Sequence, residues 1–179
     1  MNIEIVNWPR DSDWMEVKRR ALVTVGKTPV KEPSERWKHE MLVQRHSPIR
    51  NLQISFLLED IPYWLSTEFS RHVHAQPYIR SQRNDRQEAY DRNAARQDAP
   101  VSMIWDFNAE SFMVCANKRL CQMASKEARA VMAHMCILLE EKCPEFMGTL
   151  VPMCIYHGHV CHESRGCGLC PYDGMEGDD

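Results

Sequence analysis

The arginines between positions 71 and 96 are the side chains in this sequence best suited to binding an anion. Six of them fall within 26 residues, at positions Arg71, Arg80, Arg83, Arg86, Arg92 and Arg96. Arginine binds phosphate and carboxylate through paired N–H donors and stays charged when it is desolvated. Asp85, Glu88 and Asp91 lie among them, so a solvated face with ion pairs is the competing interpretation. The chain has a net charge of −3 and a pI of about 6.2, which favours a local anion site over a long nucleic-acid track.

Four cysteines near the end of the chain form the second pattern that could do chemistry. Three histidines are interspersed among them, in the order Cys154, His157, His159, Cys161, His162, Cys167 and Cys170. In a chain without an export signal, such clustering favours a metal over disulfides. The Cys167-x-x-Cys170 spacing is a usual half of a tetrahedral zinc site, although six residues separate Cys154 from Cys161. We therefore predict a structural zinc knot on the four cysteines; a set of reduced thiols, or a histidine replacing one cysteine, is the alternative.

The composition is that of one folded domain. The 179 residues are 44% hydrophobic and 26% charged, so disorder is excluded for most of the chain. No window approaches the roughly 20 apolar residues of a membrane helix, and the first residues contain no apolar signal core. We expect a cytoplasmic protein. Four further cysteines lie in apolar helical sequence and are interpreted as small core residues: Cys115, Cys121, Cys136 and Cys143.

Hydrophobic periodicity predicts an α+β fold in which helices dominate. Helices are expected over about Asp13–Leu22, after a cap at Ser34, from Ile61 to Phe69, after a cap at Asn108, and over Glu127–Glu141 before Pro144. Alternating apolar residues predict strands over 52–58 and 101–107. Residues 73–99 are polar and rich in turn formers, which suits a binding segment better than a core element.

Five segments in a fixed order carry a resemblance to a known enzyme family. They are His46 in RHSPIR, RHV followed by seven residues and SQR (71–83), ARQDAP (95–100), FNAES (107–111), and RLC followed by A, E and R (119–129). In this order they resemble the flavin-dependent thymidylate synthases, whose signature is RHR, seven residues and S-x-R. The resemblance implies an α+β fold, rich in helices, with a central, mainly antiparallel sheet. The domain with this fold is expected to cover residues 1–150. Residues 151–179 are expected to form a separate Cys/His-rich tail.

The resemblance also implies a reaction. The family methylates dUMP at C5 to give dTMP, with a one-carbon unit that passes from methylenetetrahydrofolate through reduced FAD and with NADPH as reductant. Its sites form between the subunits of a homotetramer. The resemblance assigns phosphate binding to Ser81, Arg83 and Arg96, nucleotide contact to Glu68 and Arg119, with Arg119 catalytic, and FAD binding to His46, Arg71, His72, Val73 and Asn108. Neither a membrane nor a nucleic acid is an expected partner.

The sequence departs from the family pattern at four positions near flavin or nucleotide. Val73 stands in place of the third residue of RHR, and Glu68 stands where the family has a glutamine. Ile79 stands where the family has a glutamate, and Glu110 where it has an arginine. Two alternatives follow. The chain could modify another pyrimidine nucleotide or transfer a different one-carbon group, or it could be a nucleotide-binding module that has lost flavin. A zinc-dependent nucleic-acid binder ranks last.

Overall fold

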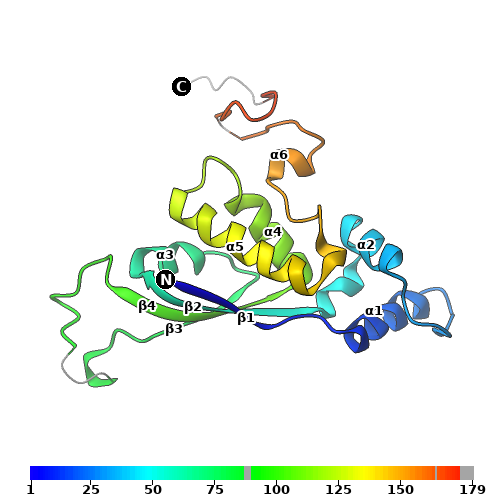
Figure 1. Ribbon diagram of the computed structural model, residues 1–179, viewed down its shortest axis with the longest axis horizontal. Helices are drawn as coiled ribbons and strands as arrows, with labels where there is room; N and C mark the ends of the chain where they lie inside the picture. Colours follow the sequence, from blue (N-terminus) through cyan, green and yellow to red (C-terminus); the bar gives the residue numbers. More distant parts are fainter. Residues whose placement is uncertain (87–89, 164, 174–179) are drawn as a thin grey trace.

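The predicted α+β architecture is confirmed in the computed structural model, which describes residues 1–86, 90–163 and 165–173 (Figure 1). Its strands and helices are, in order, β1 (Asn2–Asn7), α1 (Asp11–Val23), α2 (Glu35–Val43), η1 (Ser47–Asn51), β2 (Gln53–Pro62), α3 (Tyr63–Phe69), β3 (Gln76–Ile79), η2 (Asn84–Arg86), β4 (Pro100–Asn108), α4 (Ala109–Arg119), α5 (Lys126–Lys142), η3 (Pro144–Phe146) and α6 (Met153–Tyr156). None of the described helices is long and apolar enough to cross a membrane.

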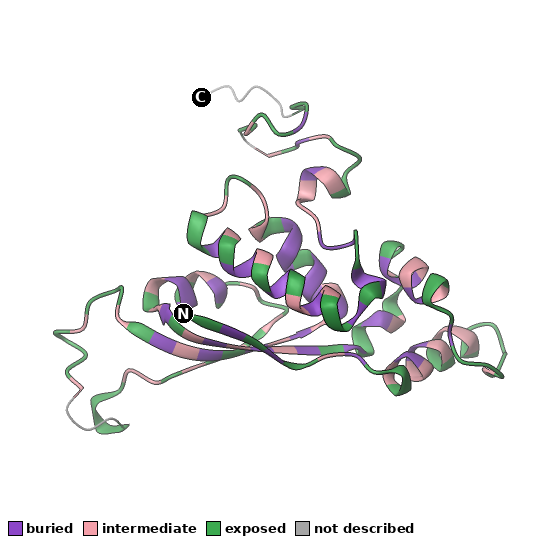
Figure 2. Ribbon diagram, in the orientation of Figure 1, coloured by how far each residue is buried: buried purple, intermediate pink, exposed green. Residues whose placement is uncertain are grey.

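The four described strands form one antiparallel sheet in the order β1-β2-β4-β3. Side chains of a strand alternate between its two faces, so the apolar alternation in β2 and β4 directs one set to the core. Ile54 and Phe56 of β2 are fully buried, as is Trp105 of β4, which pairs with Phe56 across the strands. The alternation of buried and exposed positions along these strands is visible in Figure 2. The two strands that periodicity predicted are therefore the two central strands of the sheet.

Helices α3, α4 and α5 cover the same face of the sheet (Figure 1). Aromatic rings fill the space between them: Phe112 of α4 stacks on Phe56 at 5.4 Å, and Phe69 of α3 stacks on Trp105 at 4.6 Å between centroids. Such pairs add about 0.5–1.5 kcal/mol beyond the burial of their area. This aromatic layer fixes the ends of α3 and α4, where the candidate site lies.

Capping side chains set the helix starts where the sequence predicted them. The Ser34 side chain accepts a hydrogen bond from the backbone N–H of Trp37, and the Asn108 side chain accepts one from Ser111. The Ser111 hydroxyl oxygen accepts a hydrogen bond from the Asn108 backbone N–H, which completes a reciprocal cap. Asn108 therefore ends β4 and begins α4, and its position is rigid.

Three sequence expectations need correction. The first strand, β1, was not predicted, and β3 lies inside the segment that was expected to hold no core element. Cys121 is not a core residue: it is only half-buried and follows the end of α4. The other predicted core thiols are buried, and burial raises the pKa of both Cys136 and Cys143 to about 12, so they are unreactive packing residues.

The chain between β3 and β4 leaves the body of the molecule as an arm, which we define as residues 80–86 and 90–99 (Figure 1). Near the end of the chain, the described part of the tail (residues 153–163 and 165–173) lies beyond α4 and α5 and has its own small cluster of buried residues. The prediction that residues 151–179 are a unit separate from 1–150 stays a prediction.

Candidate functional site

The ends of α3 and α4 bring together three side chains that the sequence placed near nucleotide and flavin. Arg119, the last residue of α4, donates from Nε to His72 Nε2 at 2.7 Å, and its Nη1 forms an ion pair with Glu68 of α3. Arg119 Nη2 also donates to the Glu68 carbonyl oxygen at 3.2 Å. The Ser125 hydroxyl donates to the second carboxylate oxygen of Glu68 at 3.1 Å. We call Glu68, His72 and Arg119 the Arg119 cluster.

His72 is held neutral in this cluster. Burial, together with the positive charge of Arg119, lowers its pKa from 6.5 to about 4. Because Arg119 Nε donates to Nε2, the ring proton lies on Nδ1. The ring also lies against Trp105, with centroids 5.9 Å apart. His72 therefore acts as a hydrogen-bond acceptor toward Arg119 and not as a second cation.

Two adjoining clefts lie where β4 passes into α4, and His74 and Asn108 line both of them. The larger, of about 530 Å³, also contains Arg50 and Glu110, which form an ion pair. The smaller, of about 230 Å³, extends past Val73. Together they are open, partly polar and large enough for part of a ring cofactor. Glu110, which stands where the family that the sequence resembles has an arginine, thus has its charge paired with Arg50.

The residues predicted to bind FAD are not gathered in one place. Val73 and Asn108 line the smaller cleft, and His72 lies in the Arg119 cluster. Arg71 is exposed just after α3, and His46 is exposed before η1, where its Nε2 lies 2.7 Å from Gln44 Oε1. Of these five residues, Val73 and Asn108 line the clefts, where the Asn108 amide can bond to a polar cofactor; the described part of the chain does not enclose one.

The residues predicted to bind phosphate lie on the arm. Arg83 forms an ion pair with Asp85 at 2.5 Å, and Arg96 forms one with Asp98 at 2.8 Å. Ser81 Oγ accepts a hydrogen bond from the Arg83 backbone N–H at 3.3 Å. Hydrogen bonds from these arginines lower the pKa of Asp85 and of Asp98. Within one chain, therefore, these arginines pair with their own arm, as the competing interpretation predicted.

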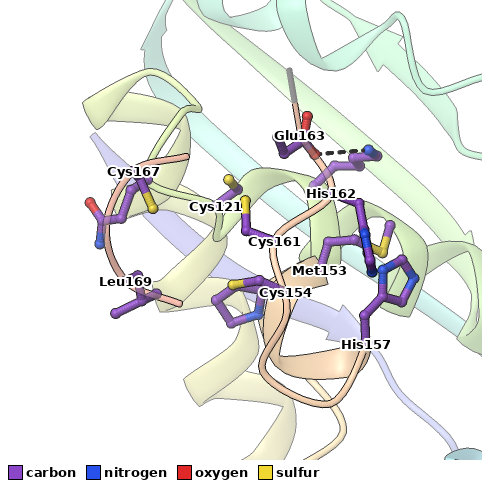
Figure 3. A pocket seen from close by; sticks show the side chains of 12 residues that line it. Cys121, Met153, Cys154, His157, Cys161, His162, Glu163, Cys167 and Leu169 are labelled. Carbon is purple, nitrogen blue, oxygen red and sulfur yellow. Dashed lines mark hydrogen bonds and ion pairs between the residues drawn. The ribbon is translucent and has the colours of Figure 1, made fainter. Parts of the chain in front are cut away.

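The tail cysteines lie partly together. Cys154, Cys161 and Cys170 share one buried cluster, while Cys167 is half-buried and lines a pocket of about 150 Å³ together with Cys154 and Cys161 (Figure 3). Burial and the neighbouring Cys170 thiol raise the pKa of Cys154. Among the described residues, no group of three or more His, Cys, Asp and Glu side chains is arranged to hold a metal ion, so the structure gives the zinc prediction no direct support.

Four participants were missed by the sequence reasoning. Ser125 bonds to Glu68, Trp105 lies against His72, and His74 and Arg50 line the larger cleft. His74 carried a signal, because it follows the RHV segment directly. Arg50 carried one too, because it is the last residue of the RHSPIR segment. Ser125 and Trp105 depend on contacts between distant parts of the chain that no local pattern records.

This fold is similar to solved structures of thymidylate synthase X (ThyX) from Helicobacter pylori. One, with FAD and dUMP at 2.31 Å resolution, has a TM-score of 0.66 and 14% sequence identity, covering 84% of this chain and 99% of that chain. A second, also complexed with FAD and dUMP, has a TM-score of 0.66 and 12% identity, covering 84% of this chain and 100% of that chain. The chain matches no protein-family model and no curated protein. At this identity the likeness establishes the fold.

Proposed function

We propose that this chain is a flavin-dependent thymidylate synthase-like enzyme of the cytoplasm. It would transfer a one-carbon unit from methylenetetrahydrofolate through reduced FAD to C5 of dUMP, giving dTMP, with NADPH as the reductant. The observation that carries the proposal is the Arg119 cluster. His72 and Arg119 belong to separate sequence landmarks 47 positions apart, yet they form a direct hydrogen bond in a ThyX-like fold. A likeness of fold without function would not require these two side chains to meet.

Arg119 is the residue that we propose acts on the pyrimidine. Its guanidinium has five N–H donors, and the contacts with Glu68 and His72 use three of them within the described part of the chain. The remaining donors can bind a ring oxygen and stabilise negative charge that develops as C5 becomes nucleophilic. Glu68 and His72 then serve to hold the guanidinium in one orientation, because each fixes a different edge of it.

Binding of FAD is proposed at the two clefts beside Asn108. When bound, FAD supplies the redox chemistry and the carrier for the one-carbon unit. The chain contributes hydrogen-bonding groups from His74 and Asn108 and a cation from Arg50, whose partner Glu110 is partly exposed. A negatively charged cofactor group can compete with Glu110 for Arg50, because an ion pair whose arginine is this exposed is screened by water and contributes little.

Phosphate binding is proposed at Ser81, Arg83 and Arg96 of the arm. Exchange of an aspartate partner for a doubly charged phosphate favours the ligand, because guanidinium and phosphate form paired charge-assisted hydrogen bonds. The arm extends away from the body of its own chain (Figure 1). We therefore propose a homotetramer, in which an arm of one subunit completes the site that carries Arg119 in another.

The first test is an absorbance spectrum of the purified protein before and after addition of FAD and dUMP. We expect a flavin band that dUMP perturbs, followed by turnover with methylenetetrahydrofolate and NADPH. The product is then identified by mass, because a product heavier than dTMP by one oxygen would reveal hydroxymethyl transfer. A colourless protein that still binds dUMP would overturn the enzyme proposal in favour of a binding module.

The phosphate assignment has its own test with matched arm variants. Arg83→Ala should weaken dUMP binding at least tenfold by calorimetry while flavin stays bound. Arg86→Ala, which removes an exposed arginine of the same arm, should change it less than twofold. Equal dUMP affinity in the wild type and the Arg83 variant would refute the assignment.

A further inference from the structure

The described part of the tail packs around thiols and not around apolar side chains. Cys154, Cys161 and Cys170 form a buried cluster separate from the main core, and Ile155 is the partly buried hydrophobic residue described against it. All three cysteines are free thiols in the structure. Because a small folded segment buries little apolar surface, cross-links commonly stabilise such segments. The thiol cluster is therefore the part of the tail where a covalent bond would have the most effect.

Backbone hydrogen bonds hold the three cysteines together before any such bond forms. The Val160 N–H donates to the Cys154 carbonyl at 3.1 Å. The Cys161 N–H donates to the Pro171 carbonyl at 2.9 Å, and the Cys161 carbonyl accepts from the Asp173 N–H at 2.9 Å. Each buried cysteine lies at one of these hydrogen bonds or directly beside it. The backbone thus sets which thiols are neighbours.

Two of the three buried thiols are in direct contact. Burial, and next the hydrogen bond with the Cys170 thiol, raise the pKa of Cys154. The Cys161 thiol affects Cys154 more weakly, through its charge alone. Thiols that already touch can meet by small rotations about χ1, without a change of the backbone. Cys154 and Cys170 are therefore the pair best placed to form a bond.

The fourth cysteine of the tail lies outside the buried cluster. Cys167 is half-buried and lines the adjoining pocket, as does Cys121 of the main domain (Figure 3). Gly168 follows Cys167 with φ of +82°, a conformation that L side chains rarely adopt, so the chain turns between Cys167 and Cys170. Cys121 and Cys167 are thus nearby thiols that do not belong to the buried cluster.

We propose that Cys154 and Cys170 form a reversible disulfide, which joins α6 to the segment that pairs with Cys161. The oxidant is a low-molecular-weight disulfide. The Cys170 thiolate attacks one of its sulfurs and releases the other as a thiol, and the Cys154 sulfur then displaces the remaining one from the mixed disulfide. The two cysteines lose two electrons, and their two protons end on the two small thiols.

The order of these two steps follows from the surroundings of the thiols. Burial raises the pKa of Cys154 and so disfavours its thiolate, which is the nucleophile of thiol exchange. Cys154 therefore reacts second, when its partner is already in contact and the step is intramolecular. A pair of this kind stays reduced where small thiols are in excess and closes when their disulfides accumulate.

The test maps disulfides in the full-length wild-type chain. Protein purified under reducing conditions is equilibrated with oxidised glutathione, its free thiols are blocked with N-ethylmaleimide, and it is denatured and digested with trypsin. Arg165 is the one Lys or Arg after Lys142, so a bond between Cys154 and Cys170 joins the peptides before and after Arg165. Fragmentation of the joined peptides by mass spectrometry identifies the two cysteines.

We expect the Cys154–Cys170 bond in most chains and its loss when reduced glutathione is restored. Eight blocked thiols after oxidation, a glutathione adduct without an internal bond, or a bond from either cysteine to another one in its place would each overturn the proposal. This measurement uses the wild-type chain, so it does not depend on a variant that folds.

Matched serine variants of the same turn give a second readout. Cys170→Ser should leave less than a tenth of the wild-type cross-link between the two peptides, whereas Cys167→Ser should keep the full amount. Equal loss in both variants, or full retention in Cys170→Ser, would overturn the assignment of the pair. Neither measurement requires flavin or nucleotide, so the result is independent of the proposed enzyme activity.

Discussion

Replacement of His72 by glutamine should remove one pH-dependent contribution to the stability of the fold. The pKa of His72 falls from 6.5 to about 4 in the folded chain because the ring is half-buried beside Arg119. In the unfolded chain the ring titrates near 6.5, so between about pH 6.5 and pH 4 the unfolded state binds more protons. The contribution of His72 to the free energy of unfolding therefore rises with pH in this window, and it is lost as the pH falls from about 6.5 to about 4.

The magnitude follows from the width of the window. At 1.36 kcal/mol for each pH unit, the interval from 6.5 to about 4 corresponds to about 3 kcal/mol. Partial access of water to the ring reduces this to about 2 kcal/mol. Glutamine still accepts a hydrogen bond from Arg119 but cannot be protonated, so His72→Gln should lose less stability than the wild type when the pH falls from 7 to 4.5.

Urea unfolding at several pH values provides the assay. The carboxylates that titrate near pH 4 are shared by both proteins, so their contribution cancels in the difference. His134→Gln, which removes an exposed histidine of α5, is the control and should follow the wild-type curve. If the wild type and His72→Gln show the same dependence on pH, or if NMR gives His72 a pKa of 6 or above, the argument for a neutral, buried acceptor is wrong.

Two further substitutions test the polar contacts that hold the fold. Trp14→Phe breaks the 2.6 Å hydrogen bond to buried Glu145, whereas Trp105 Nε1 has no partner among the described residues. Trp14→Phe should therefore lower the free energy of unfolding by about 1–3 kcal/mol more than Trp105→Phe. Equal losses in urea unfolding would contradict this. Glu68→Gln should destabilise the chain by about 2 kcal/mol because Arg119 is mostly buried, and by more than loss of the more exposed Arg50–Glu110 pair. The reverse order in chemical denaturation would refute this ranking.

The central elements could be predicted because their local patterns are strong. β2 and β4 are covered on one face by helices, so every second residue is apolar. The edge strands β1 and β3 carry a weaker signal. β3 is four residues long and contains Pro77, which removes a backbone donor and is tolerated only at an edge. Short edge strands gain their stability from the neighbour, which a local pattern does not contain.

The roles given to the individual site residues stay predictions, and the arrangement of these residues could not be predicted from the sequence. The landmarks identified His72 and Arg119, yet the hydrogen bond between them depends on how α3 and α4 end over the aromatic layer. The prediction that Cys121 is a core residue was wrong for a related reason: its apolar neighbours resemble a continuing helix, whereas α4 ends two residues earlier. Where a helix stops is decided by tertiary contacts as well as by propensity.

The charges of the candidate site are paired within the chain, which bears on how a ligand can enter. Arg119 is held by Glu68 and by the neutral His72, and the side chains of Arg119 and Glu68 are largely buried. Arg83 and Arg96, in contrast, are held by exposed aspartates. An exposed pair is weak and can be exchanged for phosphate, but the buried pair is costly to open. Under the proposed function, nucleotide binding is expected to rearrange the arm and leave Arg119 in place, so that the guanidinium would meet the pyrimidine already oriented. A preorganised cation of this kind contributes to the transition state without a cost of reorganisation.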